Sequence, residues 1–218
     1  MASNTTHSPG SLPAWKWTGG ETLDFVRALN ERCLQVLGRQ VTEEGRIFPG
    51  YETFEMVAAC QKLWFELNES ARCRAAKCPF LLIDMRFKNE RWWREVGDGA
   101  NCPDGKSTDP SIFPAESAHE LSAETLTLAW HTARSDPRIA SQVLGLAPAV
   151  VGIVAALGPR EVQRTAARHS HQLRPRWESN PAFWQQLLST AISGNAESLS
   201  EFHLHGLQLL GGDLLDRI

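Results

Sequence analysis

The sequence predicts an all-α fold, and three observations support this prediction. Apolar residues recur at spacings of three and four through most of the chain, which is the period of an amphipathic helix. Almost no segment alternates apolar and polar residues, as a half-buried strand would. Proline and glycine stand where the apolar patterns begin and end. The 218 residues are 42% hydrophobic, enough to bury a core in one large domain or two small ones.

The first half of the chain predicts a tail followed by a helical unit over residues 21–95. Residues 1–20 are rich in Ser, Thr, Pro and Gly and predict a disordered tail. Apolar spacing then predicts three helices, the first with Leu23 on its apolar face and Gly38 as its stop: Glu21 or Thr22 to Leu37, Tyr51 to Leu67, and Ala71 to Lys77. The apolar run from Phe80 to Phe87 fits either a strand or the start of a further helix.

The second half begins after a stretch rich in Gly, Pro, Asp and Ser, which predicts a linker over residues 96–116. Ser117, with Glu120 three residues later, predicts a capping box that opens the unit 117–218. Gly211 and Gly212 are expected to end its last helix. The helices expected here are Ser117 to about Ala133, Arg138 to Leu144, Pro148 to Leu157, Pro159 to Ser170, Trp184 to Ala191, and Ser198 to Leu210.

An internal repeat of 21 positions relates the two halves without gaps. Leu67 to Phe87 and Leu157 to Trp177 share their first Leu, an Arg at the eighth position, an Ala at the tenth, and a final Arg followed by an aromatic residue. The tetrapeptide Gln-Val-Leu-Gly precedes each copy, at Gln35 to Gly38 and at Gln142 to Gly145. Chance identity in Ala- and Arg-rich helices is the other interpretation. A true repeat predicts a pseudo-dimer of two helical units within one chain.

The segment from Pro148 to Arg168 predicts a helix-turn-helix. An apolar helix is followed by a tight turn at Leu157 and Gly158 and by a second helix that starts at Pro159. Although the chain carries a formal charge of −3, its stretch from Gly158 to Trp177 contains five arginines and one glutamate. Such a segment suits DNA phosphates, while a solvated basic helix face is the alternative. The candidate DNA-binding residues are Arg160, Gln163, Arg164, Arg168, Arg174 and Arg176.

Two pairs of adjacent aromatic residues predict a protein interface. They are Trp92 with Trp93, and Phe183 with Trp184. Adjacent side chains of a regular element do not both point into the same core face, so we expect one member of each pair to be available to a partner. Burial of both members in irregular structure is the alternative.

The sequence predicts neither a metal site nor a cofactor. The His-x-His pairs His169/His171 and His203/His205 point apart on a helix, so we interpret them as surface or capping residues. Cys73, Cys78 and Cys102 lack the paired spacing of a structural zinc site. No nucleophile elbow or phosphate-binding glycine loop is present, and we expect no enzymatic activity. Five cysteines, an odd number, favour reduced thiols, and an N-terminus without a secretory pattern favours a cytoplasmic location. The longest apolar stretches are shorter than the ~20 residues of a bilayer span, so we expect no membrane insertion.

The second half resembles FlhD, the subunit of the bacterial flagellar master regulator that pairs with FlhC. The resemblance runs from Leu126 to Trp177 with its spacing maintained, and a weaker echo ends at Arg86 and Phe87. The residues that carry it are Leu126 to Ala129 (LTLA), Asp136, Ala140, Leu144-Gly145, Ala155 to Leu157, Val162, Ala166 and Arg176-Trp177. The chain is longer than such a subunit, and Phe202 to Ile218 has no counterpart. The resemblance implies an all-helical fold, an FlhC-like protein partner and promoter binding.

Two functions therefore follow as expectations. The first is an FlhD-like transcription regulator subunit that forms an oligomer with an FlhC-like partner, contributes to promoter DNA binding and helps to recruit RNA polymerase. The second is an all-helical adaptor or structural component of a bacterial secretion or motility apparatus, which binds protein only. Salt-sensitive DNA binding separates them, because only the first predicts it.

Overall fold

The computed structural model describes residues 19–42, 54–97 and 111–215, and these are mostly helical. Within them two strands, β1 (Ile83–Asp84) and β2 (Arg174–Pro175), pair antiparallel. The all-α prediction is thus confirmed for the bulk of the fold, and the small sheet is an addition to it. The helices are α1 (Gly19–Thr42), α2 (Glu55–Ala59), α3 (Gln61–Glu66), α4 (Glu69–Ala75), α5 (Glu90–Gly97), α6 (Ala115–Ser135), α7 (Pro137–Gln142), α8 (Pro148–Ala156), α9 (Pro159–His169), α10 (Pro181–Ser193) and α11 (Ala196–Leu215).

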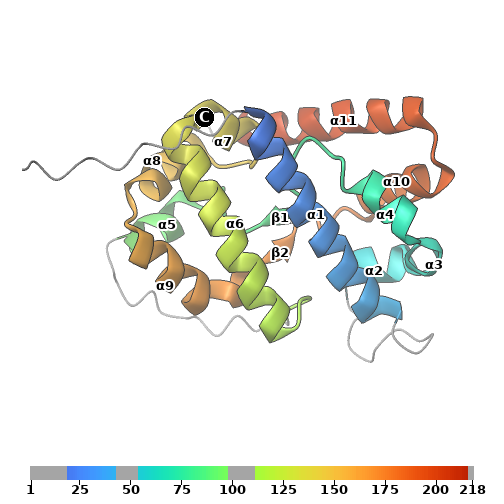
Figure 1. The fold of residues 1–218 in the computed structure, drawn as a ribbon, viewed down its shortest axis with the longest axis horizontal. Helices are drawn as coiled ribbons and strands as arrows, with labels where there is room; N and C mark the ends of the chain where they lie inside the picture. The colour runs from blue at the N-terminus through green and yellow to red at the C-terminus, as the bar shows by residue number, and fades with distance from the viewer. Residues whose placement is uncertain (1–18, 43–53, 98–110, 216–218) are drawn as a thin grey trace, which may run out of the picture.

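The helices of the two halves are interleaved in space (Figure 1). The long helices α1 and α6 lie side by side, and the two strands meet near the centre of the same view. Helix α10 packs against α2, α3 and α4, while α5 packs against α8. Helix α9 lies along α6, and α11 contacts α10 and α7. Each half therefore covers apolar surface of the other.

The described residues share one hydrophobic core that includes side chains from both halves. Its largest buried side chains include Trp64, Trp93 and Trp184. No boundary between a unit 21–95 and a unit 117–218 is visible in this core. Residues 1–18 of the expected tail and 98–110 of the expected linker lie outside the described residues. None of the helices in the described ranges combines the length and the apolar character that crossing a bilayer requires.

Helix boundaries in the first half differ from the prediction: α4 begins and ends two residues before the expected bounds, α5 was not predicted, and α1 and the helix after it differ most. Helix α1 continues past Gly38 to Thr42, so the predicted stop is wrong. A single glycine inside a helix costs about 1 kcal/mol, which a long packed helix tolerates. Leu23, expected on the buried face, is 42% exposed. The helix expected from Tyr51 to Leu67 is instead divided at Cys60 into α2 and α3, and residues 51–53 lie outside the described part of the chain.

The apolar run from Phe80 to Phe87 is not helical: its central residues form β1, and bends and a turn flank the strand. Hydrogen bonds of Asn30 on α1 explain why this run does not form a helix. Its side-chain amide donates to the Phe80 carbonyl at 2.9 Å, and its side-chain oxygen accepts from the Leu82 N–H at 2.8 Å. A helix would pair these backbone groups internally, so the buried Asn30 satisfies the polar groups of a non-helical segment.

The second half follows the prediction more closely. Helices α8 and α9 lie within one residue of their expected bounds, each with Pro at its first position. The capping box at Ser117 is wrong, because α6 begins at Ala115 after Pro114 and Ser117 lies within its first turn. The expected end at Gly211 and Gly212 is also wrong, since α11 continues to Leu215.

The repeat without gaps agrees with the starts of helices α4 and α9, but the strands that follow these helices are offset by one further residue. Helices α4 and α9 begin at Glu69 and Pro159, 90 positions apart, whereas the strands begin at Ile83 and Arg174, 91 positions apart. The shared ending is therefore not equivalent in space: Arg86 is exposed, whereas Arg176 is buried. The two copies of Gln-Val-Leu-Gly also differ, because one lies inside α1 and the other begins with the last residue of α7.

Candidate nucleic-acid interface

Helices α8 and α9 are joined by a two-residue connection, Leu157 and Gly158, where the sequence predicts the turn of a helix-turn-helix. The indole N–H of Trp130 on α6 donates to the Leu157 carbonyl at 2.8 Å and ties the turn to α6. The Gly158 N–H donates to a carboxylate oxygen of Glu161 at 2.6 Å, which caps the start of α9. These local contacts fix the position of α9 relative to α6.

One face of α9 is buried and the opposite face is exposed. Val162, Thr165, Ala166 and His169 are buried on the side that packs against α6. Arg160, Gln163, Arg164 and Arg168 are all exposed. Because Arg160, Arg164 and Arg168 follow one another at intervals of four, their side chains form a single row, which we call the α9 arginine row.

The C-terminal part of the α9 arginine row borders the C-terminal end of α5. Arg164 and Arg168 line a small polar pocket of about 70 Å³ together with Val96, Gly97 and Glu161. Glu161 is the one acidic side chain on α9, and its carboxylate accepts the capping hydrogen bond from Gly158. The row thus presents three guanidinium groups beside a carboxylate whose charge faces a helix N-terminus.

Two of the six predicted DNA-binding residues are not available, which corrects the prediction. Arg176 is 3% exposed; its guanidinium donates to the carbonyls of Leu81 and Leu144, both at 2.8 Å, and lies 3.6 Å from a carboxylate oxygen of Asp84. Arg174 is partly buried and donates to the His171 and Leu173 carbonyls. Both side chains donate hydrogen bonds to backbone carbonyls near β1 and β2, because buried carbonyl oxygens need hydrogen-bond donors.

The aromatic pairs are also placed differently from the expectation. Trp92, Trp93, Phe183 and Trp184 are all buried, so the expected exposed member of each pair is absent. In each pair the rings meet edge to face, with centroids 5.0 Å apart in the first and 5.9 Å in the second. Adjacent side chains both reach the core because each of these helices packs against the other half, α5 against α8 and α10 against α2, α3 and α4.

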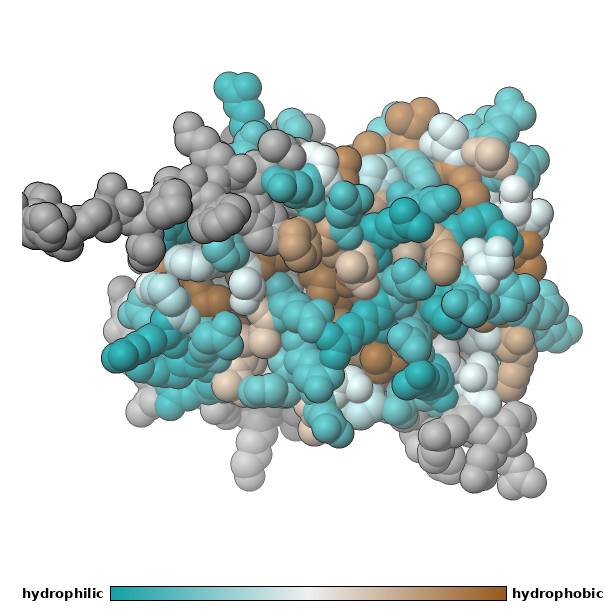
Figure 2. Space-filling view, in the orientation of Figure 1, coloured by the Kyte–Doolittle hydropathy of each residue, from teal (hydrophilic) through white to brown (hydrophobic). Residues whose placement is uncertain are grey.

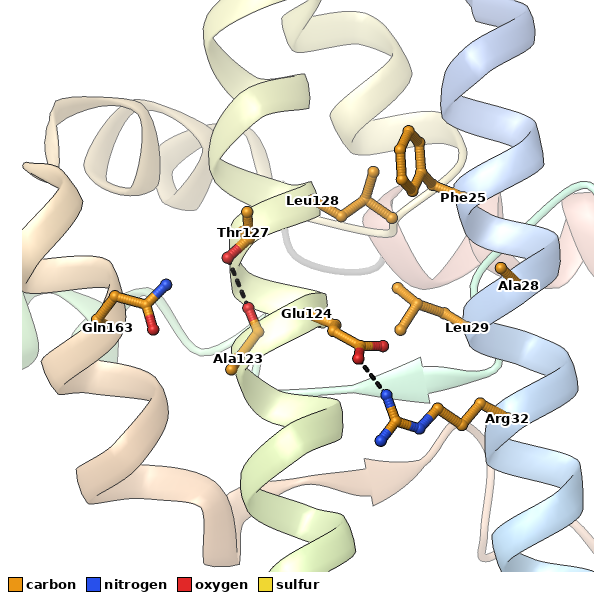
Figure 3. A pocket seen from close by; sticks show the side chains of 9 residues that line it. All are labelled: Phe25, Ala28, Leu29, Arg32, Ala123, Glu124, Thr127, Leu128 and Gln163. Carbon is orange, nitrogen blue, oxygen red and sulfur yellow. Dashed lines mark hydrogen bonds and ion pairs between the residues drawn. The ribbon is translucent and has the colours of Figure 1, made fainter.

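Sequence reasoning missed an apolar groove between α1 and α6. The groove has a volume of about 530 Å³, and Figure 3 shows Phe25 and Leu29 facing Leu128 across it. Arg32 pairs with Glu120 and Glu124 at one end. Gln163 of α9 also lines the groove, so the groove lies beside the α9 arginine row. Figure 2 shows apolar residues on this face between α1 and α6, among hydrophilic neighbours.

A signal for the groove was present in α1. Phe25 stands directly before the buried residue Val26, so the apolar surface of α1 is wider than one helix face, and Phe25 is 47% exposed. An apolar residue outside the buried face of a helix indicates either a second contact or an exposed patch.

The cysteines and histidines of the described residues do not assemble a metal site, since no group of three ligand-type side chains comes together there. Burial raises the pKa of the Cys60 thiol to about 11 and raises the pKa of Cys33 and Cys78 further, so these free thiols stay protonated. Cys102 lies outside the described residues. Burial lowers the pKa of His203, whose ring nitrogen Nε2 is buried. His169 is buried as well, with its ring edge-to-face against Trp92.

Comparisons of the chain with models of protein families, with curated proteins and with solved structures find no match. The resemblance to FlhD therefore depends on the residues between Leu126 and Trp177 alone. In the structure these residues form the end of α6, helices α7 to α9, and β2.

Proposed function

We propose that this protein is an FlhD-like transcription regulator subunit that contacts DNA phosphates through the α9 arginine row and acts with a protein partner of the FlhC type. The exposed row of Arg160, Arg164 and Arg168, on a helix that follows α8 after a two-residue connection, is the observation that carries this proposal. The resemblance of the segment from Leu126 to Trp177 to FlhD supports a promoter as the DNA target and RNA polymerase as a further partner.

The geometry of α9 suits phosphate contact. Residues four apart on a helix are about 6 Å from one another, so the row offers a line of positive groups that a phosphate backbone can follow. Each arginine that neutralises a phosphate releases condensed counterions, which makes binding depend on salt. Four buried residues on the opposite face hold α9 against α6, so the row is presented by a rigid element.

The proposal is tested by reversing charge in the row. We expect Arg164→Glu with Arg168→Glu to weaken binding to the native promoter region by roughly tenfold or more and to reduce the slope of log affinity against log salt by about two. Fluorescence anisotropy with labelled promoter DNA, measured from low to physiological salt, gives both quantities.

Arg39→Glu with Arg138→Glu is the matched control, because both side chains are exposed on other helices and the net charge changes equally. Circular dichroism of both double variants establishes that the fold is retained. Equal affinity and equal salt slope for the α9 variant and the control would remove the DNA-binding role.

An adaptor that binds protein only, as part of a secretion or motility apparatus, is the second candidate. The apolar groove between α1 and α6 favours it, because exposed Phe25 and the apolar lining suit a protein contact. Capture of a protein partner that is lost in Phe25→Asp, together with no salt-sensitive DNA binding, would select this function. Retention of partner capture in Phe25→Asp would place the contact elsewhere on the molecule.

A further inference from the structure

The two strands are related to each other by a local twofold arrangement. Ile83 pairs with Pro175, and Asp84 pairs with Arg174. A shift of 91 positions carries Ile83 onto Arg174 and Asp84 onto Pro175, so it maps each pair onto the other. Every antiparallel strand pair has a local twofold axis, so the pairing is compatible with two equivalent units, and the same shift in the segments that follow the strands is what indicates their equivalence.

The turns that follow the strands repeat the same backbone geometry with the same shift. Arg86 and Trp177 are the two non-glycine residues with positive φ in the described chain, at 53° and 54°. The N–H of Asn89 donates to the Arg86 carbonyl, and the N–H of Asn180 donates to the Trp177 carbonyl, both at 2.8 Å. A left-handed residue other than Gly, Asn or Asp is uncommon, so its double occurrence in matching turns is informative.

The helices after these turns also begin in the same way. The Asn89 side chain accepts from the Trp92 N–H at 3.0 Å, and the Asn180 side chain accepts from the Phe183 N–H at 3.3 Å. One turn later, the indole N–H groups of Trp93 and Trp184 donate to backbone carbonyls just before their helices, those of Arg86 at 3.1 Å and Arg176 at 3.0 Å, although the second acceptor lies one residue before the position that the shift of 91 gives. Helices α5 and α10 are thus equivalent at their starts.

Each of these two helices packs on the other half. On the first half, the Trp184 ring lies 6.2 Å from that of Trp64, and the Gln185 amide donates to the Ala59 carbonyl at 3.0 Å. On the second half, the Trp92 ring of α5 lies 5.1 Å from the His169 ring. A Cβ added at Gly97 would meet the Ile153 side chain of α8 at 3.4 Å.

Because α5 and α10 each pack on the other half, the arginine at the eighth position of both sequence copies has a structural role. The Arg74 guanidinium donates to the Ala191 carbonyl at 2.7 Å, near the C-terminal end of α10. Arg164, 90 positions later, borders Val96 and Gly97 at the end of α5. Each arginine therefore lies at the end of the helix that the other half contributes, where a positive charge is favourable.

We infer that the chain is a fused dimer with exchanged helices: two equivalent halves, each completed by the helix that follows the strand of the other. Each half is the partner surface for the other, and the segment between α5 and α6 serves as a covalent link. The two halves then form one cooperative folding unit, unlike two domains that fold separately and dock.

The test cuts the link in the intact protein. A protease site is placed within residues 98–110, and the purified full chain is cleaved under native conditions. We expect both fragments to elute together at the volume of the intact protein and to unfold in one transition whose urea midpoint falls on dilution. Separate elution of two helical fragments, or two independent transitions, would overturn the inference.

A second measurement tests the exchange itself by native-state hydrogen exchange. We expect Trp184→Leu, a substitution in the second half, to reduce amide protection in α3 and α4 of the first half. Val162→Ala is the control, because Val162 is buried on α9, which packs against α6. Loss of protection confined to the second half in both variants would contradict an exchanged α10.

Discussion

At the scale of single residues, Arg176 shows how one side chain organises the centre of the molecule. Its guanidinium donates to carbonyls of Leu81, Ile83 and Leu144, which come from both halves. Hydrogen bonds from a charged donor contribute about 1.5–3 kcal/mol, and leaving buried acceptors unpaired costs free energy. This cluster explains why an arginine occupies a position where the first half has the buried residue Met85.

Gly145 provides a sharp test of this packing. Its φ of 72° lies in the left-handed region, and an added Cβ would lie 2.5 Å from Nη1 of Arg176 and 2.8 Å from a methyl group of Leu210. We expect Gly145→Ala to lower the free energy of unfolding by about 2–4 kcal/mol, from backbone strain and the displaced guanidinium. Urea denaturation followed by circular dichroism measures this loss.

Gly152→Ala is the matched control, since nothing lies within 4 Å of its added Cβ and Gly152 is inside α8. There we expect no loss, or a gain of up to about 1 kcal/mol from helix propensity. If both variants were equally stable, the close packing around Arg176 would not be a feature of the protein in solution.

At the scale of elements, several helices around the central strands begin with a side-chain cap. Asn68, Asp136 and Asn180 each accept a backbone N–H of the helix that follows, and Asn89 does the same for α5. Caps matter most for short helices, because a larger share of their backbone N–H groups lacks an internal partner. The equivalence of α5 and α10 therefore has an energetic consequence that is open to measurement.

We expect Asn89→Ala and Asn180→Ala each to reduce the free energy of unfolding by about 1 kcal/mol, because each removes the acceptor of one N-terminal N–H. Asn→Asp at either position should retain most of the stability, since Asp caps equally well. Thermal and urea unfolding of the four variants gives the comparison. A loss at one position with none at the other would show that the two helix starts are not energetically equivalent.

At the scale of the whole molecule, the two halves differ on their outer surfaces although their centres match. Helix α9 has eleven residues and exposes an arginine row, whereas α4 has seven and its Arg74 guanidinium is bound to the end of α10. Arg72 and Arg74 are also less exposed than Arg160, Arg164 and Arg168. Within the described residues, one half presents the candidate DNA-binding face and the other does not.

This asymmetry leads to a prediction that depends on the proposed DNA binding. We expect in vitro selection from random DNA, performed with the complex of the protein and its partner, to give one half-site per copy of this chain. A symmetric homodimer would instead contact two half-sites about one helical turn apart. Mass photometry of the complex on the selected duplex counts the chains. Two half-sites per copy would contradict a single binding face.

The sequence by itself determined the features whose causes lie within a few residues. Pro148 and Pro159 mark helix starts through local geometry, and the structure confirms both. The spacing of Arg160, Arg164 and Arg168 predicted one exposed row for the same reason, because helix periodicity places them on one face. Gly38 and Ser117 misled the prediction because their local preferences are weak compared with packing along α1 and α6.

Only the tertiary structure decided the features that depend on partners far away in the chain. Arg160 and Arg176 are the same residue type in one basic segment, yet one is exposed and the other is buried against the Leu81 carbonyl, 95 residues away. The Phe80 to Phe87 run is not helical because Asn30, on another element, forms hydrogen bonds with its backbone at Phe80 and Leu82. The aromatic pairs are buried because α5 and α10 cross between the halves. Burial is a property of the assembled core, and no local pattern contains it.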